Sequence, residues 1–232
     1  MSRVQWHVEH IVDRLSGEMR PMILYVLLGL LSFAIVVDVV WRLASRRFSL
    51  PCPTWLRWLV EIDNPWAINS THSIIPLLDL RSGMKVLDVG CGPGRLSVPI
   101  AREVGPEGRV VAIDMQPGML QRAKERALRE KISNIEFLQI GAGEGNLGGG
   151  LYDRAILVTV LGEIPDRDGA LKEIFAALKP GGLLSITETI MDPHFQRRNV
   201  VLQLAAAAGF VERDFFGNLI WYTLLLAKAE AR

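Results

Sequence analysis

The chain has 232 residues, half of them hydrophobic, which is enough for one α/β domain and an additional segment. Its 26 basic and 25 acidic residues give a net charge of +1, so it lacks the overall positive field that attracts nucleic acid. Two cysteines, Cys52 and Cys91, are too few for a disulfide framework, which favours a reducing, cytosol-facing environment. Because the His, Cys, Asp and Glu residues lack the spacing of metal ligands, we expect no metal site.

The N-terminal segment begins with an amphipathic pattern. Residues 2–20 carry apolar side chains at helical intervals, which indicates a helix on a membrane surface or the beginning of one longer helix. Gly17 and Pro21 favour a break between this stretch and the residues that follow.

Residues 22–40 would be apolar on every face of a helix, and Asp38 is their single charge. As a helix they would measure roughly 28 Å, close to the thickness of the bilayer hydrocarbon. Polar residues before the run disfavour a cleaved signal peptide, and a buried core helix usually shows a narrower apolar stripe. We therefore predict a transmembrane or membrane-inserted helix within residues 1–48.

Arginines flank this apolar run on both sides, with a slight excess downstream. They are Arg3, Arg14 and Arg20 before it and Arg42, Arg46, Arg47 and Arg57 after it. The bias favours a single-pass or monotopic membrane protein whose C-terminal part faces the cytoplasm. The N-terminal segment would also suit pairing with a second copy, as in a homo-oligomer.

Residues 49–69 are typical of a linker followed by a short helix. Ser49–Thr54 contains two prolines, and Trp55 and Trp58 lie beside Arg57. Tryptophan beside arginine is typical of a membrane interface, although the same helix would also pack on a soluble domain.

From residue 70 the sequence alternates strands with helices and predicts one domain over residues 70–232. Such alternation is typical of a doubly wound, mainly parallel sheet, so we expect an α/β fold with seven strands. Two β-rich runs joined by Gly217 and Asn218 indicate a final hairpin, which makes one strand antiparallel. The predicted strands are 85–89, 109–113, 135–140, 153–160, 182–188, 210–216 and 219–227, and the predicted helices are 70–79, 95–103, 117–131 and 167–178.

The sharpest motif is a glycine-rich turn, Gly90-Cys91-Gly92-Pro93-Gly94, directly after an apolar strand. Glycines let a ligand press against the backbone, and the helix that follows offers free N–H groups. Such a turn suits a nucleotide phosphate or an amino-acid carboxylate. A dinucleotide fingerprint needs glycine or alanine where this chain has Arg95, and Asp88 would suit a ligand with an ammonium group. Both details favour S-adenosylmethionine over NAD.

This turn resembles the first motif of the class I, Rossmann-like S-adenosylmethionine-dependent methyltransferases, and the resemblance covers most of residues 70–228. The strand that ends at Asp114 resembles the second motif of that family. Residues 152–162 resemble its fourth-strand motif, and residues 178–182 resemble the turn after the next helix.

The resemblance implies where the cofactor binds. Asp114 is expected to accept hydrogen bonds from both ribose hydroxyls, and Met115 to lie against the adenine. The other expected cofactor-binding residues in these motifs are Asp88, Gly90, Cys91, Gly92, Gly94 and Val160.

The chain departs from the family after the third strand. Relatives commonly have Gly-Asp-Ala-Glu there, whose aspartate meets the adenine amine, whereas this chain has Gly141-Ala142-Gly143-Glu144. We expect backbone groups of Ala142 and Gly143 to contact the adenine instead, with Glu144 as a compensating acid.

Methyl transfer from a sulfonium needs alignment more than acid–base chemistry, and a base matters only if the acceptor must lose a proton. Glu163 follows the fourth strand and His194 follows the fifth, so both are expected at the carboxyl ends of strands, where open α/β sheets bind ligands. These two are our candidate catalytic residues.

A membrane anchor raises the concentration of the catalytic domain against lipophilic acceptors. We therefore predict an enzyme that methylates a lipophilic small molecule or a lipid, with phospholipid amines, quinol precursors and lipophilic thiols as candidates. The alternatives are a nicotinamide-dependent oxidoreductase and a non-catalytic, cofactor-binding membrane scaffold. The sequence has no basic tract with interleaved aromatics, so we do not expect nucleic-acid binding.

Overall fold

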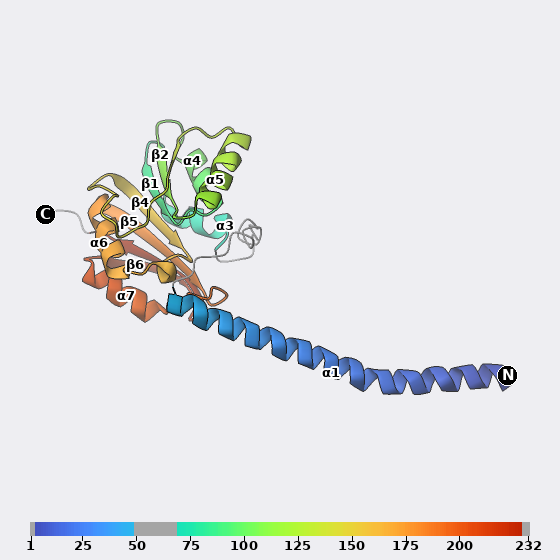
Figure 1. Cartoon of the computed structure of the whole chain (residues 1–232). Coiled ribbons are helices and arrows are strands. Elements are labelled where there is room, and N and C mark those ends of the chain that lie inside the picture. The colour runs from blue at the N-terminus through green and yellow to red at the C-terminus, as the bar shows by residue number, and fades with distance from the viewer. Residues whose placement is uncertain (1–2, 49–68, 229–232) are drawn as a thin grey trace. The chain divides into compact units, whose positions relative to one another are not determined.

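A computed structural model describes residues 3–48 and 69–228 of the chain (Figure 1). It divides into two compact units, Met1–Ala44 and Ser45–Arg232. The linker and the interfacial helix predicted over residues 49–69 lie, except for Asn69, outside the described residues.

The first helix, α1, runs without interruption from Arg3 to Phe48 (Figure 1). The predicted break near Gly17 and Pro21 is therefore wrong. Proline at position 21 removes one helical hydrogen bond, the one to the carbonyl of residue 17, at a cost of about 3 kcal/mol. The continuous turns on both sides of the proline outweigh this local loss, because helix propagation is cooperative.

Within α1, the 24 residues Met22–Ser45 form a stretch that is long and apolar enough to cross a membrane. None of its most apolar stretch is buried. The charge of Asp38 is balanced within the helix, since its carboxylate accepts a hydrogen bond of 2.7 Å from Arg42 one turn later. The helix thus has the composition and the exposure expected of the predicted membrane segment.

The second unit is built on a seven-stranded sheet with the order β3-β2-β1-β4-β5-β7-β6. All neighbouring strands from β3 to β5 pair in parallel, whereas β7 runs antiparallel to both β5 and β6. This confirms the predicted mainly parallel α/β sheet with one reversed strand. The strands are β1 Lys85–Val89, β2 Arg109–Ile113, β3 Ile135–Leu138, β4 Tyr152–Val158, β5 Leu178–Thr189, β6 Val211–Gly217 and β7 Trp221–Ala227.

Helices cover both faces of the sheet (Figure 1). The alternation of side chains along β1 shows why: Val86 packs into the core on one face, while Leu87 and Val89 pack into the core on the other. The first face is covered by α3 (Thr71–Ile74), η2 (Ile75–Leu78), α4 (Ser97–Glu103) and α5 (Pro117–Arg129), and the second by η3 (Leu161–Glu163), α6 (Arg167–Ala177) and α7 (Arg198–Ala207).

The sequence did not predict α7. Its N-cap residue, Arg197, makes no side-chain capping bond, and two β-branched residues follow in the first turn, so the usual start signals are absent. The helix forms because Val201 and Ala205 bury fully against the sheet. Tertiary packing therefore decides the structure of this segment.

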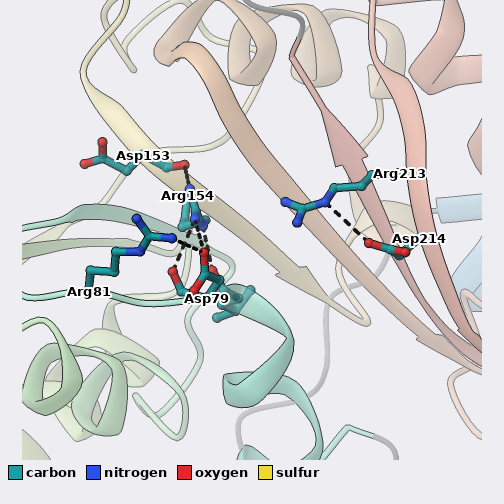
Figure 2. A network of polar contacts seen from close by, with 7 residues as sticks. Asp79, Arg81, Asp153, Arg154, Arg213 and Asp214 are labelled. Carbon is teal, nitrogen blue, oxygen red and sulfur yellow. Dashed lines mark hydrogen bonds and ion pairs between the residues drawn. The ribbon is translucent and has the colours of Figure 1, made fainter.

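A buried arginine attaches the N-terminal part of the domain to β4 (Figure 2). Arg154 is 8% exposed, and its Nε donates a hydrogen bond of 2.6 Å to the carbonyl of Leu78 at the end of η2. The same guanidinium donates to the Asp79 carbonyl at 3.2 Å and lies 3.6 Å from the Asp79 carboxylate. Arg81 pairs with that carboxylate from the exposed side at 2.9 Å.

We expect Arg154→Met to lower the stability of the folded chain by about 2 kcal/mol, because two backbone carbonyls lose a charged donor inside the protein. Arg81→Met removes an exposed ion pair of the same Asp79 and should change stability by less than about 0.5 kcal/mol. Thermal unfolding of the full chain in detergent micelles measures both. Equal shifts in the two variants would contradict the anchoring role of Arg154.

Candidate functional site

A pocket of about 380 Å³ opens at the carboxyl ends of the central strands. This is the edge at which parallel α/β sheets bind their ligands, because the loops there converge from both sides of the point where strand order reverses. The pocket is lined by Asn69, Asp88, Gly90, Cys91, Gly92, Pro93, Arg95, Leu96, Val158, Thr159, Thr189, Met191, Asp192 and Pro193.

The glycine turn forms one wall of the pocket, and its backbone requires glycine. Gly90, Gly92 and Gly94 have φ angles of +68°, +53° and +75°, in the left-handed region that other residues avoid. A Cβ at residue 90 would lie 2.5 Å from Cγ2 of Val160, and one at residue 94 would lie 3.1 Å from the Cα of Ala123. The turn is therefore packed between the end of β4 and α5, with no room for side chains at these two positions.

The backbone of Cys91, in the same turn, connects the turn to a neighbouring strand. Its N–H donates a hydrogen bond of 2.9 Å to the carbonyl of Ile113, which ties the turn to β2. Burial raises the pKa of the Cys91 thiol well above its ordinary value, so the sulfur stays protonated and is not a nucleophile at neutral pH.

Asp88 brings a carboxylate to the pocket wall although it is only 4% exposed. Burial raises the pKa of Asp88 from 3.8 to about 6, the hydroxyl of Ser97 and the charge of Arg95 lower it, and Asp114 raises it. The Ser97 hydroxyl donates to one carboxylate oxygen at 2.5 Å. Above pH 6 the pocket therefore contains a poorly hydrated negative charge, which suits a cationic ligand.

Asp114 directly follows β2 and is hydrogen-bonded to the backbone of the glycine turn. One of its carboxylate oxygens accepts the N–H of Gly92 at 2.9 Å, and the other accepts the N–H of Gln116 at 2.8 Å. Burial raises the pKa of Asp114, and these two N–H donors lower it. The next residue, Met115, is 64% exposed and does not line the pocket.

The segment after β3 is arranged differently from the expected adenine contact. Gly143 donates its N–H to Oε2 of Glu173 at 2.5 Å, and Leu147 donates to the other oxygen at 2.9 Å. The Gly143 N–H is thus already used by α6, and Ala142 packs against the core beneath. Glu144 folds back over Gly141, where a Cβ would lie 2.6 Å from its Oε1. The sequence did not identify Glu173, because its role depends on a long-range contact.

The two candidate catalytic residues lie near the pocket but do not line it. Glu163 ends η3, and its N–H donates to the carbonyl of Val160 at 2.9 Å. His194 is 4% exposed and its N–H donates to Oδ1 of Asp192 at 2.5 Å. Asp192 itself lines the pocket, so it is the acid of this loop that is nearest to a bound ligand.

Glu188, at the end of β5, is a buried carboxyl that the sequence analysis did not single out. It is 1% exposed; its Oε2 accepts the N–H of Gln196 at 2.9 Å, and its Oε1 has no partner among the described residues. Burial raises the pKa of Glu188 from 4.5 to about 8, to which the charges of Asp192 and Glu163 contribute. The available signal was an acid within the buried half of β5. Glu188 lies under the loop that forms the β5 side of the pocket.

Comparison with known families matches residues 80–216 of the chain to a family described as a methyltransferase domain. Among solved structures, the chain is similar to a SAM-dependent methyltransferase from Aquifex aeolicus, with a TM-score of 0.68 and 20% identity. The match covers 77% of this chain and 100% of that one.

Among curated proteins, the chain is 38% identical over 108 residues to a demethylmenaquinone methyltransferase of Lactococcus lactis subsp. lactis (strain IL1403), covering 47% of this chain and 43% of the relative. It is 36% identical over 111 residues to a ubiquinone/menaquinone biosynthesis C-methyltransferase, UbiE, of Idiomarina loihiensis, covering 47% and 44%. The chain thus spans less than half the length of the curated relatives it matches.

We expect Glu188→Gln to flatten the pH dependence of stability between about pH 4.5 and pH 8. In that window the unfolded chain has released a proton that the folded chain keeps on Glu188, so wild-type stability falls as the pH rises, by up to about 1.4 kcal/mol per pH unit. The glutamine variant lacks this proton and should be more stable than wild type at pH 8. Unfolding midpoints of the full chain in micelles at several pH values measure the effect.

The matched control is Glu136→Gln, which removes a carboxyl that is 40% exposed on β3. It should keep the wild-type pH profile. Parallel profiles for wild type and Glu188→Gln would mean that the buried carboxyl does not bind the extra proton.

Proposed function

The chain belongs to the methyltransferase-domain family, and from that premise we propose that it transfers the methyl group of S-adenosylmethionine to a ring carbon of a lipophilic quinol precursor at a membrane. The observation that carries this proposal is the 38% identity over 108 residues to a demethylmenaquinone methyltransferase. A second relative bears the name of a C-methyltransferase of ubiquinone and menaquinone biosynthesis, which favours carbon as the acceptor atom.

Residues that line the pocket, together with Asp114 and Met115 outside its lining, fit S-adenosylmethionine. The buried Asp88 carboxylate would take the ammonium charge, and Gly90 and Gly92, which line the pocket without side chains, would let the cofactor approach the backbone. Asp114 retains lone pairs beyond its two backbone bonds and would accept the ribose hydroxyls. Met115 would cover the adenine.

When bound, S-adenosylmethionine supplies a methyl group already activated by a positively charged sulfur. The rest of the chemistry is alignment and the removal of one proton, because a ring carbon that gains a methyl group must lose its hydrogen. Asp192 lines the pocket and would receive that proton. The backbone N–H of His194 would hold the Asp192 carboxylate in place. Glu163 would add a negative charge near Glu188, on which Asp192 also acts.

The proposed membrane attachment rests on α1. Its exposed stretch over Met22–Ser45 matches the bilayer in length, and the slight excess of arginines after it favours a domain on the cytoplasmic side. Attachment would concentrate the enzyme against an acceptor that is itself dissolved in the bilayer.

The other acceptors considered, phospholipid amines and lipophilic thiols, have the same membrane location but lack support from the named relatives. A nicotinamide-dependent reaction is disfavoured because the charge of Asp88 faces the pocket that a pyrophosphate would need. A non-catalytic scaffold would bind the cofactor without turnover, which the assay below distinguishes.

We expect the affinity of the full chain for S-adenosylmethionine to fall as the pH drops through about 6, because protonated Asp88 no longer attracts an ammonium group. Asp88→Asn should bind about 10- to 100-fold more weakly at pH 7.5, the loss of one charge-assisted hydrogen bond, and should show no pH step near 6. Isothermal titration calorimetry measures both. Asp214→Asn, on the exposed edge strand β6, is the control and should bind as wild type does.

We expect radiolabelled methyl to appear in a quinol product when the full chain in lipid vesicles receives demethylmenaquinol. Phosphatidylethanolamine and a long-chain thiol serve as competing acceptors. Asp114→Asn should lower the rate at least about tenfold, because the uncharged side chain weakens its hydrogen bonds to the ribose and to Gly92. Radiolabel in phosphatidylethanolamine or in the thiol would identify that compound as the acceptor instead. Binding of S-adenosylmethionine without any labelled product would favour the non-catalytic scaffold.

A further inference from the structure

Five large apolar side chains are exposed together at one edge of the domain. They come from the loop after β5 and from the turn between β6 and β7, and we call them the apolar rim: Ile190, Met191, Leu219, Ile220 and Trp221. Leu219 at the tip is 85% exposed and Met191 is 78% exposed. Exposure of several neighbouring large apolar residues is unusual in a soluble surface and marks a binding face.

The two segments of the rim are joined by backbone bonds. The N–H of Ile190 donates to the carbonyl of Ile220 at 2.7 Å, and Thr189 pairs with Trp221 in the sheet. The turn itself is held by Asn218, whose side-chain oxygen accepts the N–H groups of Ile220 and Trp221 at 3.0 and 3.2 Å. The rim is therefore a defined surface, presented by a braced turn at the end of a sheet.

The rim borders the pocket. Met191 belongs to the rim and also lines the pocket, and Thr189, paired with Trp221, lines it as well. A molecule that leaves the pocket on the β5 side therefore passes over an apolar surface. No charged residue occurs from Gly217 to Ala227 in the sequence, so the turn can enter an apolar medium without burying a charge.

The apolar part of α1 is the feature that would bring the domain to a membrane. The apolar segment Met22–Ser45, exposed over residues 22–40, is long enough to cross a bilayer, and about 20 residues separate the end of α1 from Asn69. Even fully extended, that connection spans at most about 70 Å, so if α1 crosses a bilayer the domain is tethered within that distance of the membrane. Tryptophan beside leucine and isoleucine is the composition that inserts into the lipid interface.

We infer that the apolar rim inserts into the lipid interface and opens the pocket directly to the bilayer, so that a lipophilic acceptor enters without crossing water. This inference rests on the proposed function for the identity of the acceptor, but the insertion itself does not. The occupant of the rim is the lipid surface. A second copy of the chain would more readily pair with the sheet edge next to the rim, which is β6, yet β6 presents Glu212, Arg213 and Asp214 there, which oppose edge pairing.

The test places a polarity-sensitive fluorophore on one introduced cysteine in the full chain, in a Cys52→Ser background in which Cys91 is buried. One variant carries Leu219→Cys. The matched control carries Leu128→Cys, an equally apolar side chain that is 79% exposed. Leu128 is in the last turn of α5, which returns from β2 towards β3 and so ends at the opposite edge of the sheet.

Both variants are reconstituted in vesicles of phosphatidylethanolamine and phosphatidylglycerol whose acyl chains carry a nitroxide quencher. We expect the label at residue 219 to lose about half of its emission and the label at residue 128 to be almost unchanged, because the interface reached by an inserted turn is about 5–10 Å deep. Equal quenching at both positions, or none at residue 219, overturns the inference. If a second copy of the chain covers residue 219 instead of lipid, the label at residue 219 is not quenched.

A kinetic arm uses Leu219→Glu and Leu128→Glu with two acceptors, demethylmenaquinol with its isoprenoid tail and tail-free naphthoquinol. We expect Leu219→Glu to raise the KM for the tailed acceptor about tenfold and to leave the tail-free acceptor unchanged. Leu128→Glu should change neither, and S-adenosylhomocysteine should bind all variants equally. The same KM increase with both acceptors would contradict the route from the bilayer. If wild type methylates neither quinol, the proposed function fails, and the quenching result still decides the rim.

Discussion

The site depends on the close contact between the glycine turn and the end of β4. Because Gly90 lies directly against the side chain of Val160, the turn after β1 cannot carry a side chain at that point. The same turn is tied to β2 through the N–H groups of Cys91 and Gly92. Three neighbouring strands thus fix a single wall, and the positions of the acids on that wall follow from this packing.

The two acids of the wall have different environments and different consequences. Asp114 has both oxygens occupied by backbone N–H donors, from Gly92 and Gln116, so its carboxylate holds the backbone of the turn. Asp88 accepts one hydroxyl donor, from Ser97, lies near the charge of Arg95, and lines the pocket. A cation in the pocket would relieve the cost of burying that carboxylate. This asymmetry is the physical basis for placing an ammonium group beside Asp88.

The sequence predicted the strands, their mainly parallel order and the glycine turn after β1, because hydrophobic alternation and glycine spacing are local signals. The exact bounds of β1 and β2 followed from their apolar runs between charged or glycine residues. Contacts between distant segments could not be predicted. Glu173 takes the N–H of Gly143 from α6, Glu188 is buried under a loop, and α7 forms through packing alone. The continuity of α1 through Pro21 could not be predicted either. The helical period of residues 2–20 indicates a helix but does not say whether cooperative helix formation outweighs the cost of a proline.

The burial of Cys91 has a chemical consequence under the proposed function, in which the acceptor is a quinol. An oxidised quinone ring is an electrophile, and a thiolate in the pocket would add to it and block the site permanently. Cys91 lines the pocket, but its buried sulfur keeps its proton and reacts slowly as a neutral thiol. The cofactor turn can therefore hold a sulfur atom beside an alkylating compound and remain intact.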